Sequence, residues 1–337
     1  MPTNRRIILA SRPKTAATTS NFRLEEVQVP TLQPGQILVR NHWLSLDPYM
    51  RGRMNETRSY VQPQALNEVM LGGTAGEVIE SRNPGFAVGN KVVAYLGWQE
   101  YGVSDGVGVF KVDTRHVPLS AYLGAVGMPG VTAWYGLNRV IDPREGHTVV
   151  VSAASGAVGS VVGQLARIRG LRAIGFAGGA EKCRYVTEEL GFDACIDYKS
   201  EGTPVDLSRR LKEAAPDGVD GYFENTGGAI TNAVLPRMNT YGRIALCGLI
   251  AGYDGQPIPI ENPAWFLISR LTLQGFIVTE HMDVWPAALK ELGEHVAAGR
   301  IKYRETIAHG IENAPQAFLG MLKGANFGKQ LVQLAGR

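Results

Sequence analysis

Cysteine is scarce in this chain, and that scarcity excludes two kinds of structure. Only Cys183, Cys195 and Cys247 occur among 337 residues, and no two of them have the short spacing of a zinc knuckle. A disulfide framework is therefore not expected, and the thiols should be reduced, as in a cytosolic protein. The six histidines show neither paired helical spacing nor a cysteine partner, so a catalytic zinc site is not expected either.

An excess of charge of one sign is also missing. The formal net charge is +3, which gives nucleic-acid binding little support. The first residues hold too few apolar side chains for a signal peptide, so we expect a cytoplasmic protein. Residues 148–166 are uncharged over almost the length of a membrane span, but serines, glycines and a glutamine interrupt them. We interpret this segment as a buried strand followed by a helix and expect no membrane contact.

The order of apolar and turn residues predicts two domains. Short alternating runs near 37–44, 74–81 and 84–103 predict a compact antiparallel barrel, with Gly85 and Gly89 at turns that would strain a residue with a side chain. From about residue 130, strands alternate with helices, which predicts a doubly wound parallel sheet. Its strands are expected at 148–153, 171–176, 194–198, 221–225, 242–248 and 271–278. The segment from Ile301 onward, with a last apolar strand, should pack back on the barrel.

The strongest local motif is a glycine turn after the first strand of the parallel sheet. The turn comprises Ser155, Gly156, Ala157, Val158 and Gly159 and leads into a helix that continues through Gly163. Its glycines let the backbone approach a pyrophosphate, while the helix N–H groups and dipole face the anion. Such turns also occur in sheets that bind nothing, but this one stands where the fold places its ligand. We therefore predict a dinucleotide site.

The choice of dinucleotide depends on the end of the second parallel strand. About twenty residues past the glycine turn, NADH-binding chains carry an acidic residue for the ribose hydroxyl. Here the chain has Gly175 to Ala180 without a carboxylate, and Lys182 follows. A small uncharged loop and a lysine leave room and charge for a 2′-phosphate, which favours NADPH. The alternative is that Lys182 is a solvated surface residue.

Catalysis without a metal needs another donor for the developing oxyanion, and tyrosine hydroxyls are the best candidates. With an ordinary pKa of about 10, a tyrosine stays protonated at neutral pH and can donate to an enolate oxygen. Tyr49 lies in LSLDPYMRGRM, and Tyr253 lies in CGLIAGY on the loop after a parallel strand. The alternative for either is an amphipathic residue at the core or its rim.

Seven motifs that span nearly the whole chain resemble one family. They are LSLDPYMRGRM (44–54), GMPGVTAWYGL (127–137), AASGAVGSVVGQLA (153–166), GGAEKCR (178–184), FENTGG (223–228), CGLIAGY (247–253) and GMLKGANFGK (320–329). Together they resemble the zinc-free leukotriene B4 dehydrogenase/prostaglandin reductase branch of the medium-chain dehydrogenase/reductase superfamily. Within it, the bacterial NADPH-dependent curcumin reductases look most similar.

The resemblance implies an α/β fold, with a Rossmann domain inserted into a GroES-like antiparallel β-barrel catalytic domain. The expected bounds are 1–125 and 301–337 for the catalytic domain and 126–300 for the NADPH-binding domain, often in a homodimer. The implied activity is NADPH-dependent reduction of the carbon–carbon double bond of a small α,β-unsaturated ketone or aldehyde. A zinc-independent quinone reductase and a catalytically silent NADPH-binding protein are the alternatives.

The resemblance also implies roles for individual residues. Ser155 to Val158 would contact the pyrophosphate, and Lys182 and Tyr198 the 2′-phosphate side. The remaining cofactor contacts would come from Asn225, Cys247, Gly248, Leu249, Ile250, Tyr253, Phe276, Ile277, Val278 and Asn326, with Met128 beside the nicotinamide. Tyr49 and Tyr253 would border the substrate and orient its carbonyl oxygen.

Two departures limit the resemblance to the curcumin reductases. Those enzymes tend to carry histidine where this chain has Asp197 and Tyr198, and the loop GLIAGYDGQPIPIENPAW is shorter here. Since this loop helps to shape the acyl pocket, the resemblance does not assign curcumin as the substrate.

Overall fold

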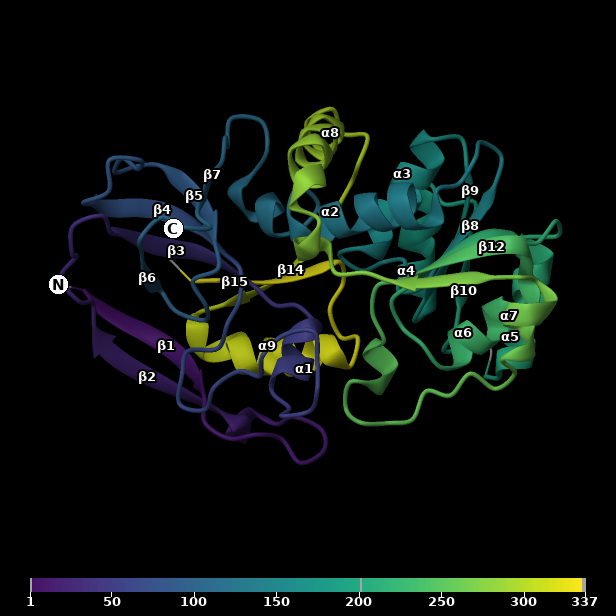
Figure 1. The fold of residues 1–337 in the computed structure, drawn as a ribbon, viewed down its shortest axis with the longest axis horizontal. Helices are drawn as coiled ribbons and strands as arrows, with labels where there is room; N and C mark the ends of the chain where they lie inside the picture. Colours follow the sequence, from purple (N-terminus) through teal and green to yellow (C-terminus); the bar gives the residue numbers. More distant parts are fainter. Residues whose placement is uncertain (1, 201, 335–337) are drawn as a thin grey trace. The chain divides into compact units, whose positions relative to one another are not determined.

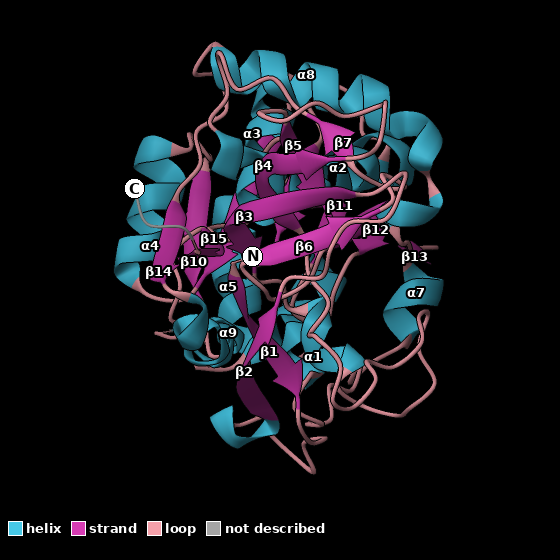
Figure 2. Cartoon of the chain, turned by 90° about the vertical axis from the view of Figure 1, so that its left-hand side faces the viewer, coloured by secondary structure: helices cyan, strands magenta, loops and turns pink. Residues whose placement is uncertain are grey.

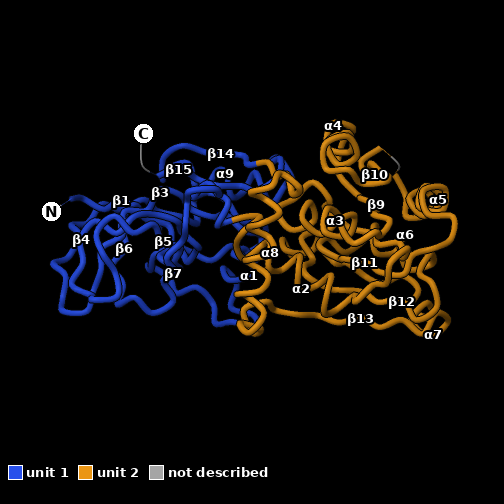
Figure 3. Tube along the Cα trace, turned by 90° about the horizontal axis from the view of Figure 1, so that it is seen from above, with its two compact units in different colours: residues 1–123, 305–337 blue, residues 124–304 orange. Residues whose placement is uncertain are grey.

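The computed structural model describes residues 2–200 and 202–334, which divide into two compact units. Unit 1 combines residues 1–123 with 305–337, and unit 2 comprises residues 124–304 (Figure 3). The sequence analysis expected the inserted domain at 126–300. The chain therefore leaves the first unit once, builds the second, and returns to complete the first.

Unit 2 is built around a six-stranded parallel sheet. Its strands are β8 (Thr148–Val151), β9 (Arg172–Ala177), β10 (Ala194–Asp197), β11 (Val219–Glu224), β12 (Met238–Leu246) and β13 (Thr272–Gly275). Their order is β10-β9-β8-β11-β12-β13, and every neighbouring pair is parallel. The order reverses between β8 and β11, where such sheets bind ligands beyond the carboxyl ends of the strands. The doubly wound sheet expected from the sequence is confirmed.

Helices cover both faces of this sheet, with α2, α3 and α8 on one side and α5, α6 and α7 on the other (Figure 1). They are α2 (Met128–Tyr135), α3 (Gly159–Ile168), α4 (Ala180–Arg184), α5 (Pro204–Ala214), α6 (Ala229–Val234), α7 (Ala264–Ile268) and α8 (Trp285–Ala297). The second group packs on Val150, Ile174 and Tyr222 of the strands in one apolar cluster. Buried helix faces on a parallel sheet explain why its strands are apolar on both sides.

Unit 1 contains a seven-stranded sheet with β3 at its centre. Its strands are β3 (Ile37–Ser45), β4 (Thr74–Ser81), β5 (Lys91–Ala94), β6 (Tyr101–Ser104), β7 (Phe110–Lys111), β14 (Glu305–His309) and β15 (Lys329–Gln333). One edge of β3 pairs with β4, while β6 and β15 pair with different parts of the strand. All pairs are antiparallel except β14 with β15 (Figure 2). The C-terminal segment therefore packs on the first sheet, as expected; closure into a barrel stays a prediction.

Helices α1 (Tyr49–Arg53) and α9 (Ala314–Leu322) belong to the same unit.

The turn at residues 83–89 departs in part from its prediction. Gly89 has a φ of +90°, a conformation that side chains disfavour, but Gly85 has no such φ. Instead, the Asn83 side chain forms this turn by accepting a hydrogen bond of 2.8 Å from the Gly85 N–H. At Gly85 a side chain would meet crowding and not an unfavourable backbone angle, because a Cβ there would lie 3.1 Å from Asn83 Oδ1.

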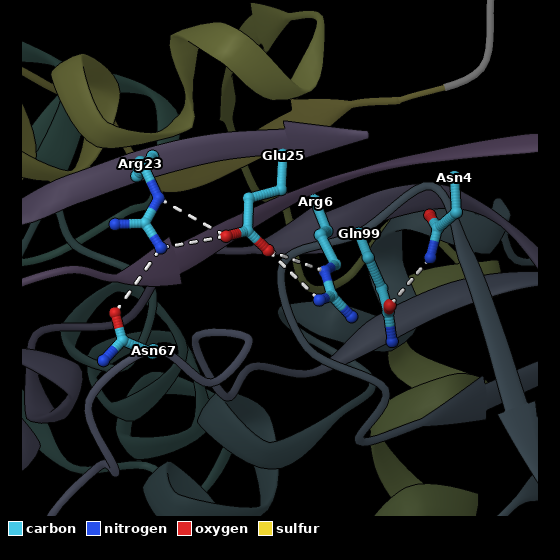
Figure 4. Close-up of polar contacts among 6 residues, drawn as sticks. All are labelled: Asn4, Arg6, Arg23, Glu25, Asn67 and Gln99. Atoms are coloured by element: carbon cyan, nitrogen blue, oxygen red, sulfur yellow. Dashed lines mark hydrogen bonds and ion pairs between the residues drawn. The ribbon is translucent and has the colours of Figure 1, made fainter. Parts of the chain in front are cut away.

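A two-stranded sheet precedes the rest of unit 1 and was not expected from the sequence. Its strands are β1 (Thr3–Leu9) and β2 (Phe22–Gln28), paired antiparallel. Figure 4 shows Glu25 accepting hydrogen bonds from Arg6 on the partner strand and from Arg23, which lower the pKa of its carboxyl group. Asn4 donates to Gln99 over 3.0 Å and so links the ribbon to the segment before β6.

Candidate functional site

The glycine turn lies between β8 and α3 and brings strand and helix very close. A Cβ on Gly159 would lie 2.4 Å from the carbonyl oxygen of Ala153, and one on Gly163 would lie 1.8 Å from the Phe192 ring. A Cβ on Gly156 would lie 3.1 Å from the same carbonyl. Side chains at Gly159 and Gly163 would force the helix away from the sheet. In the first turn of α3, the N–H groups of Ser160, Val161 and Val162 donate to the carbonyls of Gly156 and Val158. The positive end of the helix dipole still suits an anion at this turn.

The loop after β9 follows the carboxyl end of the strand next to β8. Gly178 and Gly179 separate β9 from α4, and Gly179 has a φ of +102°. A Cβ on Gly178 would lie 2.8 Å from the Tyr198 hydroxyl and 2.9 Å from Cε of Lys199. The loop therefore needs glycine because the side chains after β10 cover it. The structure brings Tyr198 to this loop, as the resemblance implies for the 2′-phosphate side.

Two lysines give the same loop a positive potential. Burial lowers the pKa of Lys182 from its ordinary value, and the charge of Lys199 lowers it further. The nearby carboxylate is occupied with the backbone: Asp197 Oδ1 accepts from the N–H of Gly179 over 2.8 Å and from that of Lys199 over 3.0 Å. Asp197 thus holds the loop in shape. The partly buried ammonium group of Lys182 and the nearby ammonium group of Lys199 suit a doubly charged phosphate.

The switch point between β8 and β11 contains a buried carboxylate. Glu224 is 1% exposed and accepts hydrogen bonds from the hydroxyls of Ser152 (2.7 Å), Tyr222 and Thr231 and from the Thr226 N–H. Burial and the Glu224 charge raise the pKa of Tyr222 well above its ordinary value, so its hydroxyl is a donor. This hydrogen-bonded group fixes the ends of both strands.

Asn225, a predicted cofactor contact, is held by two hydrogen bonds to Ser152. Its backbone N–H donates to the Ser152 hydroxyl over 2.7 Å, and its Nδ2 donates to the Ser152 carbonyl over 2.8 Å. With one Nδ2 hydrogen engaged, Asn225 can present its side-chain carbonyl oxygen and its second amide hydrogen to a ligand.

The loop after β12 is tied to the loop after β11. The N–H groups of Cys247 and Gly248 donate to the Glu224 carbonyl over 2.9 and 3.1 Å, and Ile250 donates to the Asn225 carbonyl over 3.3 Å. The Tyr253 hydroxyl lies 3.4 Å from where a Cβ on Gly248 would stand. Residues 247–253 therefore form one rim at the carboxyl edge of the sheet, with a tyrosine hydroxyl in it. Burial raises the pKa of the Cys247 thiol to about 12, so this thiol stays neutral.

Residues 276–278, which follow β13, are more buried than their predicted role as nicotinamide contacts suggests. The Phe276 ring packs 5.4 Å from the Tyr135 ring and 6.2 Å from the Phe223 ring. The Val278 carbonyl accepts from the Trp285 indole over 3.2 Å, and Ile277 is half-buried between them. Met128 begins α2 and is half-buried. The nicotinamide contacts assigned to residues 276–278 and Met128 stay predictions.

Tyr49, the other predicted tyrosine, belongs to unit 1. Its hydroxyl lies 2.7 Å from the Tyr95 hydroxyl, and the Arg53 guanidinium lies over both rings, 5.0 and 5.7 Å from their centres. Burial, together with the charge of Asp47, raises the pKa of Tyr49 well above its ordinary value. The pair is thus two neutral hydroxyls beside a cation, an arrangement suited to donating to an oxygen that gains negative charge.

Asn326 lies in the loop between α9 and β15, also in unit 1. Its Nδ2 donates to the Gly328 carbonyl over 2.7 Å, which shapes the turn and leaves its side-chain oxygen as the acceptor. It borders a groove of about 310 Å³ together with Gln316, Thr306 and Gln330. The structure therefore shows the turn-forming role of Asn326, and its contact with the cofactor stays a prediction.

Comparison with known proteins places the chain in a family. Residues 5–112 match the N-terminal domain of oxidoreductases, and residues 157–294 match the family described as zinc-binding dehydrogenase. The chain is 46% identical to the NADPH-dependent curcumin reductase of Escherichia coli, over 99% of this chain and 97% of that one. It is a medium-chain dehydrogenase/reductase. It belongs to the prostaglandin and curcumin reductase branch, as the motifs indicated.

Two further relatives extend the comparison. A 2-alkenal reductase (NADP⁺-dependent) of Nicotiana tabacum is 39% identical over 98% of both chains. The crystal structure of CurA from Vibrio vulnificus in complex with NADPH superposes with a TM-score of 0.92, at 45% identity over 99% of this chain and all of that one. The likeness thus extends over both units.

One of these family descriptions names zinc, which needs a group of metal-binding side chains. Across residues 2–200 and 202–334, no three histidine, cysteine, aspartate or glutamate side chains gather in a way that could hold a metal ion. No catalytic step is therefore assigned to a metal here. In the same residues, no helix is long and apolar enough to cross a membrane.

Four polar residues described above were not predicted from the sequence. Lys199 directly follows Tyr198, and a charge beside a predicted phosphate contact could have drawn attention to it. Glu224 ends β11 directly after the apolar pair Tyr222 and Phe223, and a carboxylate at the end of a buried strand is conspicuous. Tyr95 and Ser152 carry no such signal, because Tyr95 is 46 residues from Tyr49 and Ser152 is one of several serines in its segment.

Proposed function

We propose that this medium-chain reductase uses NADPH to reduce the carbon–carbon double bond of α,β-unsaturated ketones and aldehydes. The observation that carries the proposal is the likeness over the whole chain to an NADPH-dependent curcumin reductase, at 46% identity. The 2-alkenal reductase supports the same reaction, since a 2-alkenal has its double bond conjugated to the carbonyl group. Both substrates share an enone or enal, which defines the substrate class.

The residues at the carboxyl edge of unit 2 fit this cofactor. The close strand–helix turn at Gly156 and Gly159 binds the pyrophosphate. Lys182, Tyr198 and Lys199 bind the 2′-phosphate beside Gly178. Asn225 and residues 247–250 line the nicotinamide side, and Phe276, Ile277, Val278 and Met128 complete the proposed contacts from unit 2. Asn326, in unit 1, is proposed as a cofactor contact on the resemblance alone. When bound there, NADPH supplies the hydride for the β-carbon of the substrate.

The protein supplies the hydrogen bonds to the oxygen. Burial raises the pKa of Tyr49, so its hydroxyl is a neutral donor at neutral pH. In the proposed mechanism, either Tyr49 or Tyr253 donates to the carbonyl oxygen as negative charge develops on it. No covalent intermediate with the protein is needed. The α-carbon then takes its proton from solvent, because no acidic side chain is assigned to that position.

The proposed assembly is a homodimer in the cytoplasm. All four residues of the edge strand β13 are exposed, and Leu267 and Ile268 of the preceding α7 are 79% and 53% exposed. An open edge strand beside exposed apolar side chains favours pairing with a second copy of the chain. Light scattering on the full chain with NADPH should give twice 36.4 kDa, and a monomer at micromolar concentration would contradict this proposal.

A substrate panel tests the reaction. NADPH consumption should be followed with a 2-alkenal, an arylbutenone, curcumin, an oxo-prostaglandin and a ring quinone, and the products identified by mass spectrometry. We expect saturated ketones or aldehydes from the enone substrates. Reduction of the quinone alone would indicate a quinone reductase, and tight NADPH binding without oxidation by any substrate would indicate a silent binding protein.

The Tyr253 hydroxyl can be tested by Tyr253→Phe. Removing one donor to a developing oxyanion typically lowers kcat by about 10²–10³. NADPH affinity should be retained, since the ring remains in place, and fluorescence titration checks it. Unchanged kcat and KM with an enone would refute the role of Tyr253, and Tyr49→Phe would then be the variant expected to lose turnover.

A further inference from the structure

Two of the three cysteines lie next to each other at the adenosine end of the proposed cofactor site. Cys183 lies on α4 and Cys195 on β10, and the Cys195 thiol donates to the sulfur of Cys183 over a Sγ–Sγ distance of 3.2 Å. Both side chains are half-buried, so neither is sealed in the core. Gly175 on β9 lies beside this pair, and a Cβ there would lie 3.4 Å from the Cys195 sulfur. The arrangement is a preformed dithiol.

We propose that Cys183 and Cys195 form a redox modification site, in which a low-molecular-weight disulfide such as oxidised glutathione converts the dithiol to a disulfide and weakens NADPH binding. The chemistry of the pair is independent of the proposed function. Its effect on affinity rests on the proposed 2′-phosphate site.

The thiols differ in a way that sets the order of the reaction. The hydrogen bond from Cys195 lowers the pKa of the Cys183 thiol, while the same contact and burial raise that of Cys195. Cys183 therefore has the larger thiolate fraction and attacks first. It displaces one glutathione thiolate and forms a mixed disulfide. Cys195 then loses its proton, attacks the Cys183 sulfur and releases the second glutathione. Two cysteine thiols are oxidised by two electrons, and one glutathione disulfide is reduced to two thiols.

Closing the bond moves the residues around the phosphate site. A disulfide needs its sulfurs about 2.05 Å apart, so the two sulfurs must approach by about 1 Å, which draws α4 and β10 toward each other. Lys182 directly precedes Cys183 on α4 and moves with it. On the other side, Asp197 follows Cys195 by two residues and holds the Gly179 N–H. Both sides of the Gly178 loop are thereby displaced, while the pyrophosphate turn at Gly156 is not attached to either cysteine.

The experiment uses the full chain incubated with oxidised glutathione and then mapped by alkylation and mass spectrometry. We expect a Cys183–Cys195 disulfide, reversed by dithiothreitol. Cys247 serves as an internal reference, because burial raises the pKa of its thiol to about 12 and it should stay unmodified. The oxidised protein should bind NADPH about tenfold more weakly, the size of one charge-assisted hydrogen bond, with no change for NADH.

Two variants define the order of attack. Cys195→Ser should stop at a glutathione adduct on Cys183, whereas Cys183→Ser should remain unmodified and keep its NADPH affinity after oxidant treatment. Equal NADPH affinity of both reduced variants and the reduced wild type shows that they fold. An adduct trapped on Cys195 would overturn the assigned order.

Failure of this proposal is distinct from failure of the proposed function. Thiols that stay reduced, or a disulfide that leaves the NADPH affinity unchanged, would overturn the redox site. If the reduced wild type binds NADPH no more tightly than NADH, the proposed 2′-phosphate site fails, and thiol mapping alone then decides the dithiol chemistry.

Discussion

The two units each bury a carboxylate beside a candidate site residue, but they hold its charge in different ways. Asp47 in unit 1 is 5% exposed and forms an ion pair of 2.6 Å with Lys329, with a further hydrogen bond from the Ser45 hydroxyl. Glu224 in unit 2 is 1% exposed and is surrounded by three hydroxyls and a backbone N–H. Asp47 is therefore paired with a cation, whereas Glu224 accepts hydrogen bonds from neutral groups.

The difference has a physical consequence for robustness. An ion pair in a dry environment depends on both members, because removing one leaves an uncompensated buried charge. Hydroxyl groups can rotate and act as donor or acceptor, so a hydroxyl cage can adapt when its partner changes. The ion pair also connects distant segments, 282 residues apart, whereas the cage connects the neighbouring ends of β8 and β11. We therefore expect unit 1 to be the more sensitive to a single change.

The largest effect is expected for Lys329→Met. The methionine fills a similar volume but leaves Asp47 without its cation, which typically costs about 3–5 kcal/mol of folding free energy. Urea unfolding measures this loss. Asp47→Asn combined with Lys329→Met should recover part of it, since the buried charge is then gone. Lys91→Met is the matched control, because its pair with Glu77 has side chains about a third exposed and should cost about 1 kcal/mol or less. Equal losses in the two single variants would contradict the comparison.

A smaller effect is expected for Glu224→Gln. The amide oxygen can keep the hydrogen bonds from Ser152 and Thr226, and the amide nitrogen then faces the hydroxyls of Tyr222 and Thr231, which can turn to accept. We expect a loss of about 1–2 kcal/mol in urea unfolding. Glu213→Gln, in an exposed pair on α5, is the control and should change stability by about 0.5 kcal/mol or less. A loss from Glu224→Gln as large as that from Lys329→Met would show that the hydroxyl cage does not adapt.

The smallest effect concerns Glu305, the strand neighbour of Lys329 in unit 1. Its Oε1 is buried without a hydrogen-bond partner, and burial raises the pKa of this carboxyl group above the usual 4.5. The fold therefore favours the neutral form, so this contribution to stability is present below pH 4.5 and is lost as pH rises through the raised pKa. Glu305→Gln should be more stable than the wild type at neutral pH by less than about 1 kcal/mol, with the advantage vanishing in acid. Parallel stability profiles from acid to neutral pH would count against it.

The comparison also shows why parts of the fold could be predicted and others could not. The central strands of unit 2 were predicted because both faces of the parallel sheet are covered there, so β8 and most of β9 are buried apolar runs. The β1–β2 ribbon was missed because its strands mix apolar residues with charged ones such as Arg6 and Glu25, which pair across it. Such a ribbon becomes recognisable only when the partner strand is known.

The site divides in the same way. The glycine turn and Lys182 could be proposed from the sequence because their geometry is local: a tight approach needs glycine, and a phosphate needs a cation within a few residues. The Glu224 cage, by contrast, depends on Ser152, 72 residues away, and the Tyr49–Tyr95 pair spans 46 residues.

By itself, the sequence determined the kind of sheet in unit 2, its glycine turn and the preference for a phosphorylated cofactor, since each depends on residues a few positions apart. Only the tertiary structure decided that Asp47 faces Lys329, that Glu224 is solvated by hydroxyls, and that Cys183 and Cys195 touch. Their partners are chosen by strand order and packing, which bring distant segments together and leave no spacing rule in the chain.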